Sequence, residues 1–158
     1  MSDVQIHPTA IVDRGAEIGA GTIVGPYCVI GPDVILGPNC WLQHHVTLCG
    51  PMKAGAKNRF YAYCSIGQQT QDLKYGGEPT YLEIGDGNTF REFATAHRST
   101  TSEGKTRVGN RGNFLAYSRR ASVLSDWTVR HHRRLLKNCA GRPAIHDRRW
   151  QPGGNSRN

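Results

Sequence analysis

Every sixth residue from Ile6 to Ile66 is apolar, and the phase of this column holds through ten periods. Glycine follows a column residue six times, and a compact residue lies four positions after most of them. Amphipathic helices repeat about every 3.6 residues and half-buried strands every second residue, so neither explains the spacing. A fixed period of six is typical of a parallel β-helix. The column consists of Ile6, Val12, Ile18, Val24, Ile30, Leu36, Leu42, Leu48, Ala54, Phe60 and Ile66.

Three six-residue sides would form one coil of about 18 residues, and each coil would stack on the one before it. The column residues are expected to point inward and to pack on their counterparts in the next coil, because no single coil can bury its own interior. The glycines are expected where the chain turns, either for a positive φ or for a close approach between backbones. An all-β fold of stacked coils is therefore predicted, and a β-sandwich with coincidental spacing is the alternative.

Two polar segments interrupt the column. Residues 68–81 (QQTQDLKYGGEPTY) have no six-residue pattern and contain two glycines and a proline, and residues 99–107 form a second polar excursion. We expect both to be loops that leave the β-helix at a corner, where long loops commonly carry function. The column resumes after them, with Ile84, Phe90, Ala96, Val108 and Phe114.

The repeat stops near Ser118, and the composition changes at the same place. Phe114 predicts an apolar residue six positions later, where the chain has Arg120. Residues 1–118 hold 10 basic and 10 acidic side chains, whereas residues 119–158 hold 10 basic and 2 acidic ones, so the net charge of +8 comes entirely from the second segment. We therefore divide the chain into a hexapeptide-repeat domain over 1–118 and a basic, irregular, disordered tail over 119–158.

Three interpretations of this tail are open. Clustered arginine suits contacts with nucleic-acid phosphates. A solvated terminus without a partner is the second interpretation. The third is a slip of the reading frame, because Arg-rich ends that contain Trp and no pattern are typical of an out-of-frame, GC-rich gene. We favour the third and do not expect a nucleic-acid partner.

Composition limits the compartment and the chemistry. The sequence has no apolar run of about 18 residues and no apolar N-terminal segment resembling a signal peptide, so a cytoplasmic protein without membrane insertion is expected. Of the five cysteines, Cys28, Cys40 and Cys64 fall four positions after column residues, where a buried thiol can pack. The sequence contains no C-x-x-C pair, so we expect reduced thiols and no bound metal or cofactor.

The repeat and its first insertion together resemble a known family. The segments IHPTAIVDRGAEIGAGTIVGPYCVIGPDVILG, SIGQQTQDLKYGGEPTYLEIGDGNTFREF and AHRSTTSEGKTRVGN are similar to the N-terminal half of the acyl-(acyl-carrier-protein)–UDP-N-acetylglucosamine O-acyltransferases, which begin lipid A synthesis in Gram-negative bacteria. The similarity runs from about Val4 to Ser118. The hexapeptide part is shared with many acyl- and acetyltransferases, whereas QDLKY, GEPT, IGD-N-REF and the following HR are more specific.

This resemblance implies a left-handed parallel β-helix that assembles as a homotrimer, with active sites between neighbouring subunits. It also implies transfer of a 3-hydroxyacyl chain from the phosphopantetheine arm of acyl carrier protein to the 3-hydroxyl group of UDP-N-acetylglucosamine, without a metal or a covalent intermediate. A histidine serves as general base in the family, and a backbone amide is the expected oxyanion donor. Histidine suits this role, because its ordinary pKa lies near neutral pH and a sugar hydroxyl is a weak nucleophile.

The resemblance assigns five residues to the substrate site. Gln71, Asp72 and Lys74 occupy the QDLKY segment, whose polar side chains line the cleft in the family. Lys74 would face phosphates of the nucleotide or of the phosphopantetheine arm. His97 corresponds to a histidine that helps to position the substrate, and Arg98 follows it. A solvated loop lysine and a corner histidine packed on the β-helix are the purely structural alternatives.

The expected catalytic base is missing. The family has an H-x-x-H pair directly after the stretch that matches 114–118, and its second histidine is the base, but this chain has Arg119-Arg120-Ala121-Ser122 there. No catalytic residue can therefore be assigned near Ser122. The codons TCA-CGT-CGC-GCA-TCN would encode residues 118–122, and reading them one nucleotide later gives His-Val-Ala-His. A truncated and impaired O-acyltransferase is the preferred hypothesis, and a non-catalytic truncated solenoid or another hexapeptide acyl- or acetyltransferase of a sugar nucleotide is the alternative.

Overall fold

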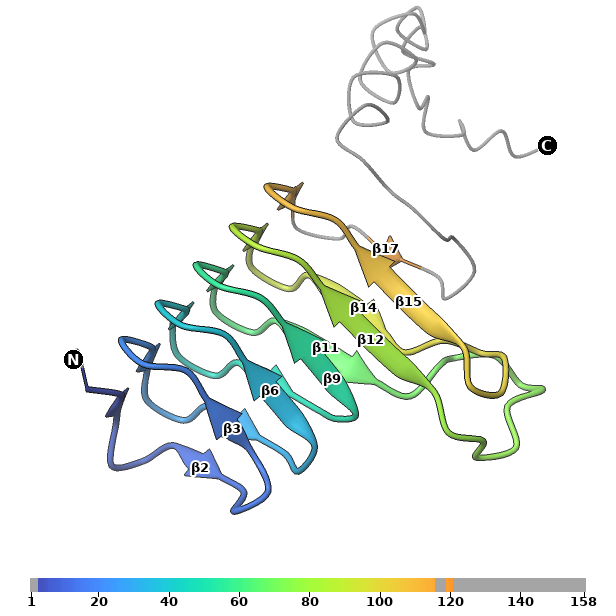
Figure 1. Cartoon of the computed structure of the whole chain (residues 1–158), viewed down its shortest axis with the longest axis horizontal. Helices are drawn as coiled ribbons and strands as arrows, with labels where there is room; N and C mark the ends of the chain where they lie inside the picture. The colour runs from blue at the N-terminus through green and yellow to red at the C-terminus, as the bar shows by residue number, and fades with distance from the viewer. Residues whose placement is uncertain (1–2, 116–118, 121–158) are drawn as a thin grey trace, which may run out of the picture.

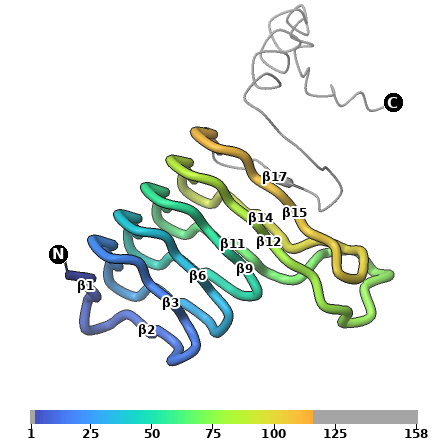
Figure 2. The backbone as a smooth tube through the Cα atoms, in the orientation of Figure 1, coloured from blue at the N-terminus to red at the C-terminus, as the bar shows by residue number. Residues whose placement is uncertain are grey.

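The computed structural model describes residues 3–115 and the backbone of residues 119–120. Over these residues the chain winds into a stack of triangular coils whose sides are short parallel strands (Figure 1). The first coil lies at one end of the stack, and the coil that contains β15 (Lys105–Val108) lies at the other (Figure 2). The predicted left-handed parallel β-helix is confirmed.

Each full coil contributes one strand to each of three parallel sheets. Sheet A consists of β1 (Gln5–Ile6), β4 (Ile23–Val24), β7 (Trp41–Leu42), β10 (Arg59–Phe60), β13 (Thr89–Phe90) and β16 (Asn113–Phe114). Sheet B consists of β2 (Ile11–Val12), β5 (Val29–Ile30), β8 (Thr47–Leu48), β11 (Ser65–Gln68), β14 (Thr95–His97) and β17 (Arg119–Arg120). Sheet C consists of β3 (Glu17–Ile18), β6 (Val34–Leu36), β9 (Met52–Ala54), β12 (Tyr81–Ile84) and β15.

Strand pairing fixes the length of each coil. Paired residues of β1 and β4 are 18 positions apart, as are those of β7 and β10. The separation rises to 30 between β10 and β13 and to 24 between β13 and β16, so these two coils carry insertions of 12 and 6 residues. We call residues 69–80 the first loop and residues 98–104 the second loop. Both protrude at the corner between sheets B and C (Figure 2).

The column residues form the core from the second coil onward. Ile6 is 46% exposed and Val12 and Ile18 are only partly buried, because no coil lies beneath the first one. The column stays in phase across both loops, as predicted. The buried members are Val24, Ile30, Leu36, Leu42, Leu48, Ala54, Phe60, Ile66, Ile84, Phe90, Ala96 and Val108.

The glycines of the repeat allow close approach between coils. A Cβ on Gly37 would lie 2.6 Å from the carbonyl carbon of Gly55 in the next coil, which no side chain tolerates. The positive φ angles fall instead on other residues two positions after the glycines, such as Asp33 at 56° and Asn39 at 57°. Of the two expected reasons for glycine, close approach is therefore the main one at these corners.

Buried polar groups at the corner between sheets C and A are paired from coil to coil. The side-chain amide of Asn58 donates to the carbonyl oxygens of Gly55 and Gly85 at 2.8 and 2.9 Å, and its oxygen accepts the backbone amide of Asn88 at 2.8 Å. Asn88 in turn accepts the amide of Gly112 at 2.7 Å. This ladder removes the desolvation cost that unpaired amides would carry in the interior.

The three repeat cysteines are buried free thiols, as predicted. Their sulfur atoms point to backbone carbonyl oxygens, with Cys28 3.0 Å from the carbonyl of Gln43 and Cys64 3.1 Å from that of Arg91. Burial raises the pKa of the Cys64 thiol to about 11. These thiols therefore fill the corners and stay protonated.

Stacked rings follow the outer corner between sheets A and B. The rings of Tyr27, His45, Tyr63 and Phe93, which we call the aromatic ridge, have successive centroid separations of 5.0, 5.1 and 5.2 Å. All four residues have left-handed φ angles between 54° and 62°. This conformation costs a non-glycine residue roughly 1–2 kcal/mol, whereas an aromatic pair contributes about 0.5–1.5 kcal/mol. Two stacked pairs and one tilted pair therefore offset only part of the backbone cost.

Parallel pairing continues past the expected end of the repeat domain at residue 118. Arg119 pairs with Thr95, and Arg120 pairs with Ala96. Ladder hydrogen bonds use backbone groups only, so the register can continue where the apolar pattern has stopped. The rest of the predicted tail, residues 121–158, lies outside the described residues.

Candidate functional site

The first loop begins at a backbone irregularity in β11. Gly67 has a φ of +80°, and a Cβ at this position would collide with the carbonyl oxygen of Cys49. The register between β11 and β14 shifts between Ile66 and Gln68 at the same place. A bulge of this kind bends a strand, and here it marks where the chain leaves the coil.

Hydrogen bonds within the first loop give it a defined shape. The amide of Asp72 donates to the hydroxyl of Thr70 at 3.2 Å, and the amide of Lys74 donates to the Asp72 carboxylate at 3.0 Å. The amide of Tyr75 donates to the carbonyl of Asp72 at 3.1 Å, and its hydroxyl donates to the carbonyl of Glu78 at 2.8 Å. Asp72 therefore builds the turn that presents Lys74.

The second loop packs against the base of the first. The hydroxyl oxygens of Thr70 and Thr100 lie 3.0 Å apart, one donating to the other. The amide of Arg98 donates to the carbonyl of Gln68 at 2.9 Å. The two loops consequently form one continuous surface at the corner between sheets B and C.

The structure places all five predicted substrate residues at this corner. Gln71, Asp72 and Lys74 are exposed in the first loop. His97 ends β14 and Arg98 begins the second loop, and both are partly buried. Their contact with a substrate stays a prediction.

Four buried side-chain polar atoms have no hydrogen-bond partner among the described residues. The hydroxyl oxygens of Thr80 and Thr106 are two of them, and the other two, Nδ1 of His97 and Nε of Arg98, belong to predicted substrate residues. Buried polar groups are normally paired, so an unpaired one can be satisfied by a ligand or by water. An imidazole nitrogen donates or accepts according to its protonation state, whereas a guanidinium only donates. The pair therefore suits a ligand rich in oxygen acceptors, such as a sugar or a phosphate.

The sequence interpretation did not single out a charged cluster on sheet C. Lys105 and Arg107 of β15 donate to Glu83 of β12 at 2.6 and 3.1 Å. The hydrogen bond from Lys105 is the largest cause of a lowered pKa of the Glu83 carboxyl group, and the hydrogen bond from Arg107 adds to it. Glu83 and Arg107, together with Lys53 and Asp86, line a shallow hollow of about 510 Å³. Lys105 and Arg107 were expected in the second loop, but they lie in β15. The sequence Lys-Thr-Arg-Val alternates charged residues with residues that point inward, and this alternation is a strand signal that could have revealed the cluster.

Two further properties concern the described residues only. Among them, no group of three or more His, Cys, Asp or Glu side chains is placed to hold a metal ion. The same part of the chain contains no helix of the length and apolar character needed to cross a membrane. The expected H-x-x-H position, from Arg119 to Ser122, falls where the structure describes no side chain.

Comparison with known proteins identifies the class of β-helix to which these coils are similar. Residues 15–50 match the family of bacterial transferase hexapeptides (six repeats). This match and the triangular coils define a hexapeptide-repeat β-helix of the kind found in bacterial transferases. More specifically, the chain resembles the N-terminal half of acyl-(acyl-carrier-protein)–UDP-N-acetylglucosamine O-acyltransferase.

Two curated relatives carry that name. The protein from Psychromonas ingrahamii is 56% identical over 113 residues, which are 71% of this chain and 43% of the relative. The protein from Saccharophagus degradans is 44% identical over 139 residues, which are 87% of this chain and 46% of the relative. The second alignment is longer than the repeat domain and so includes residues after Ser118. The chain spans less than half the length of either relative.

Solved structures agree with this resemblance. The UDP-N-acetylglucosamine acyltransferase from Francisella novicida is 41% identical with a TM-score of 0.69, over 72% of this chain and 42% of that protein. The UDP-N-acetylglucosamine O-acyltransferase from Moraxella catarrhalis is 46% identical with a TM-score of 0.68, over 70% of this chain and 44% of that protein. Each of these similarities therefore extends over a stretch about as long as the described β-helix.

Proposed function

We propose that this chain forms the N-terminal, substrate-facing half of an O-acyltransferase. The reaction would move a 3-hydroxyacyl chain from acyl carrier protein to the 3-hydroxyl group of UDP-N-acetylglucosamine, the first step of lipid A biosynthesis. The observation that carries the proposal is the corner between sheets B and C, where the loop motif lies beside the unpaired atoms of His97 and Arg98. The two curated relatives are named for this activity.

Each residue of the corner has a role in this proposal. Lys74 is exposed and its backbone amide is fixed in the turn by Asp72, and it binds phosphate oxygens through its ammonium group. Asp72 positions Lys74 through the turn, and the neighbouring Gln71 offers both a donor and an acceptor. His97 and Arg98 bind sugar or carbonyl oxygens with the atoms that have no partner.

The chemical step needs a base that this chain does not provide at the expected place. Arg119 and Ser122 stand where the family has histidines. Loss of a general base typically lowers a rate by about 10²–10⁴-fold. We therefore propose that the chain binds the substrate but transfers acyl groups no faster than background. A non-catalytic truncated solenoid is the second candidate, and the missing histidines favour it.

The proposed partners follow from the same reaction. Acyl carrier protein would be the acyl donor, and UDP-N-acetylglucosamine would be the acceptor. The chain would assemble as a homotrimer and act in the cytoplasm. Another hexapeptide acyl- or acetyltransferase that acts on a sugar nucleotide is the alternative enzyme. The QDLKY and GEPT segments of the first loop argue against it, and a screen of acyl donors would distinguish the two.

Binding of UDP-N-acetylglucosamine to the full chain, measured by calorimetry, tests the site. Lys74→Ala is expected to weaken binding about tenfold, since a hydrogen bond to a charged group contributes about 1.5–3 kcal/mol. Lys57→Asn removes another exposed lysine, at the corner between sheets C and A, and should leave binding unchanged. No binding by the wild-type chain, or equal effects of both variants, would contradict the proposed site. Acyl transfer at the rate of an intact enzyme would show that another residue supplies the base.

A further inference from the structure

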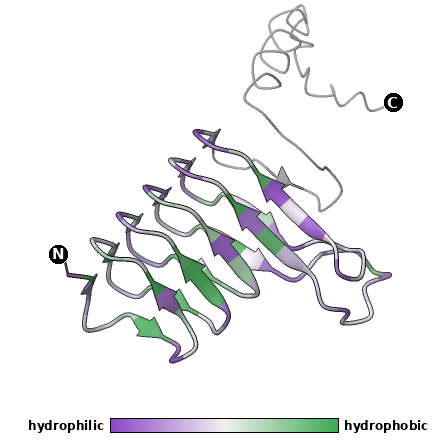
Figure 3. Ribbon diagram, in the orientation of Figure 1, coloured by the Kyte–Doolittle hydropathy of each residue, from purple (hydrophilic) through white to green (hydrophobic). Residues whose placement is uncertain are grey.

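Side chains that can bind a metal ion are unevenly spread over the outer surface of the β-helix. Figure 3 shows hydrophilic residues on β3 and β15 of sheet C, in contrast to the hydrophobic β2 of sheet B. On sheet C, the Glu83 carboxylate already accepts hydrogen bonds from Lys105 and Arg107 at 2.6 and 3.1 Å. A metal ion would have to displace two protein cations from this carboxylate, so the hollow on sheet C does not suit one.

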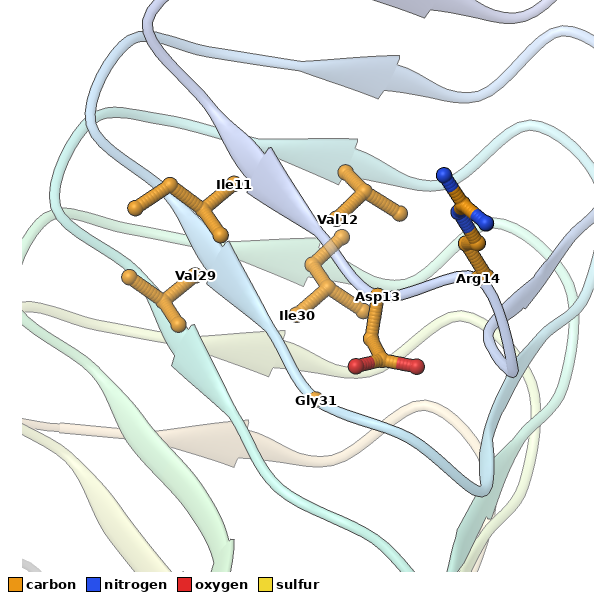
Figure 4. A pocket seen from close by; sticks show the side chains of 7 residues that line it. All are labelled: Ile11, Val12, Asp13, Arg14, Val29, Ile30 and Gly31. Carbon is orange, nitrogen blue, oxygen red and sulfur yellow. The ribbon is translucent and has the colours of Figure 1, made fainter.

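The hollow at the N-terminal end of sheet B offers no better set of ligands. It has a volume of about 470 Å³ and lies along β2 and β5 (Figure 4). The Asp13 carboxylate at its edge accepts the backbone amide of Gly15 at 2.9 Å, and Arg14 beside it would repel a cation. Most of the lining is apolar and consists of Ile11, Val12, Val29 and Ile30.

A pair of histidines at the corner between sheets A and B is different. The Nδ1 atoms of His44 and His45 lie 3.0 Å apart, and the two rings are nearly perpendicular, at 88°. His45 is exposed and His44 is half-buried. Successive side chains of an extended strand point to opposite faces, but His45 has a left-handed φ of 54°. This corner conformation brings both rings to the outer side of the coil.

The separation of the two nitrogens matches that of neighbouring ligands on one metal ion. Imidazole nitrogens bind a metal ion at about 2.0–2.1 Å, so two ligands at a right angle are about 2.8–3.0 Å apart, whereas a tetrahedral angle requires about 3.3–3.4 Å. Right angles are typical of the square-planar and tetragonal sites of Cu²⁺ and Ni²⁺, and imidazole suits both ions. The observed 3.0 Å therefore favours these ions over tetrahedral Zn²⁺.

We propose that His44 and His45 bind one Cu²⁺ or Ni²⁺ ion through their Nδ1 atoms, with water in the remaining positions. Without an ion, a neutral pair at this distance shares one hydrogen, which one Nδ1 donates to the other. On binding, this proton moves to Nε2 of its own ring, so both Nδ1 lone pairs become available and the pair loses no proton. The expectation of no bound metal rested on the missing C-x-x-C pair, whereas these histidines converge only at the folded corner.

Neighbouring rings of the aromatic ridge hold the histidine pair in place. The His45 ring lies between those of Tyr27 and Tyr63, at centroid separations of 5.0 and 5.1 Å. The His44 ring makes an edge contact with Tyr63 at 5.6 Å. Ligands that are already ordered lose less conformational entropy on binding. The folded corner should therefore bind the ion more tightly than the same two histidines do in a flexible peptide.

Metal titration of the full, untagged chain tests the pair. The sequence has a second adjacent pair, His131 and His132, outside the described residues, so both are replaced by asparagine throughout. Calorimetry with Ni²⁺, which does not oxidise thiols, should then give one ion per chain. Pulsed electron paramagnetic resonance with Cu²⁺ should detect two imidazole nitrogens on the ion. His44→Asn should leave one of them and weaken binding at least tenfold, since even loss of an outer partner of a metal ligand costs about 10–100-fold.

Two controls separate this site from nonspecific binding to histidine. His7→Asn removes another exposed imidazole, whose Nδ1 lies 2.9 Å from the Thr9 hydroxyl oxygen, and should leave the affinity unchanged. A peptide of residues 41–48 with blocked ends should bind at least tenfold more weakly than the chain. Circular dichroism checks that each variant keeps the fold. Equal affinities of chain and peptide, or equal effects of His44→Asn and His7→Asn, would overturn the proposal.

Discussion

Truncation of Phe90 to alanine should remove more stability than any other single change in the β-helix. Phe90 is 1% exposed and lies between two parallel rings, 5.2 Å from Phe60 and 4.7 Å from Phe114. Phe→Ala in a packed core costs about 3–5 kcal/mol, and the two lost stacking contacts place this site at the upper end of that range. With a urea dependence of about 2 kcal/mol per molar, the unfolding midpoint should fall by about 2 M.

Phe93→Ala makes the same substitution on the aromatic ridge and serves as the control. Phe93 is 55% exposed, and within the described part of the chain it stacks on a single ring, that of Tyr63 at 5.2 Å. Its truncation should therefore cost no more than about 1.5 kcal/mol. Urea unfolding followed by circular dichroism at several protein concentrations separates folding from assembly. Equal shifts for Phe90→Ala and Phe93→Ala would refute the view that stacked interior rings hold consecutive coils together.

Three smaller effects follow from the described contacts. Asn88→Ala removes the side-chain oxygen that accepts the Gly112 amide and the Nδ2 group that donates to the carbonyl of Gly85, and it should cost about 1–3 kcal/mol in thermal unfolding, whereas an unchanged melting curve would contradict the ladder. Cys64, whose pKa is raised to about 11, should react with iodoacetamide at pH 8 only after unfolding, as mass spectrometry can detect. The pKa of Glu83 is lowered by Lys105, so this pair stabilises the fold above pH 4.5 and loses that contribution as the pH falls further. Glu83→Gln should remove this pH dependence of the unfolding free energy. The change should be under about 1 kcal/mol, because the Glu83 side chain is 39% exposed.

Much of the fold could be predicted from one property, the six-residue column. Its members from Val24 to Val108 are buried because each packs on the equivalent column residue of a neighbouring coil. The column also predicted where the chain returns after each loop, since parallel pairing fixes the register again at β12 and β15. The first coil departs from the pattern at Ile6, because no coil lies beneath it to cover its interior side chains.

The loops and corners could not be predicted in the same way. The path of the first loop depends on Gly67 and on hydrogen bonds around Asp72, and neither follows a period. The aromatic ridge was missed because its residues lie 18 or 30 positions apart and become neighbours only once the coils are stacked. Family resemblance gave the candidate residues, and the structure added the unpaired atoms of His97 and Arg98. A function grafted on a regular scaffold depends on these irregular parts.

The end of the repeat allows a direct test of whether the strand register continues beyond the residue at which the apolar side-chain pattern stops. The backbone of residue 120 pairs in register with Ala96, which is 2% exposed, and this register predicts an interior position for residue 120. Residue 119 pairs with Thr95, so the register predicts the outer face for it. Arg120→Val should therefore extend the core and stabilise the last coil by up to about 1.5–3 kcal/mol, the value for burying one valine.

Arg119→Val is the matched control, because it makes the same change on the outer face and should add almost nothing. Hydrogen exchange of the β14 amides would report the difference, since protection of one coil depends on the coil stacked on it. A frame slip that restores His-Val-Ala-His would place valine at this same interior position. If Arg120→Val protects β14 no better than Arg119→Val, position 120 is not interior, and the register of β17 with β14 does not continue the core.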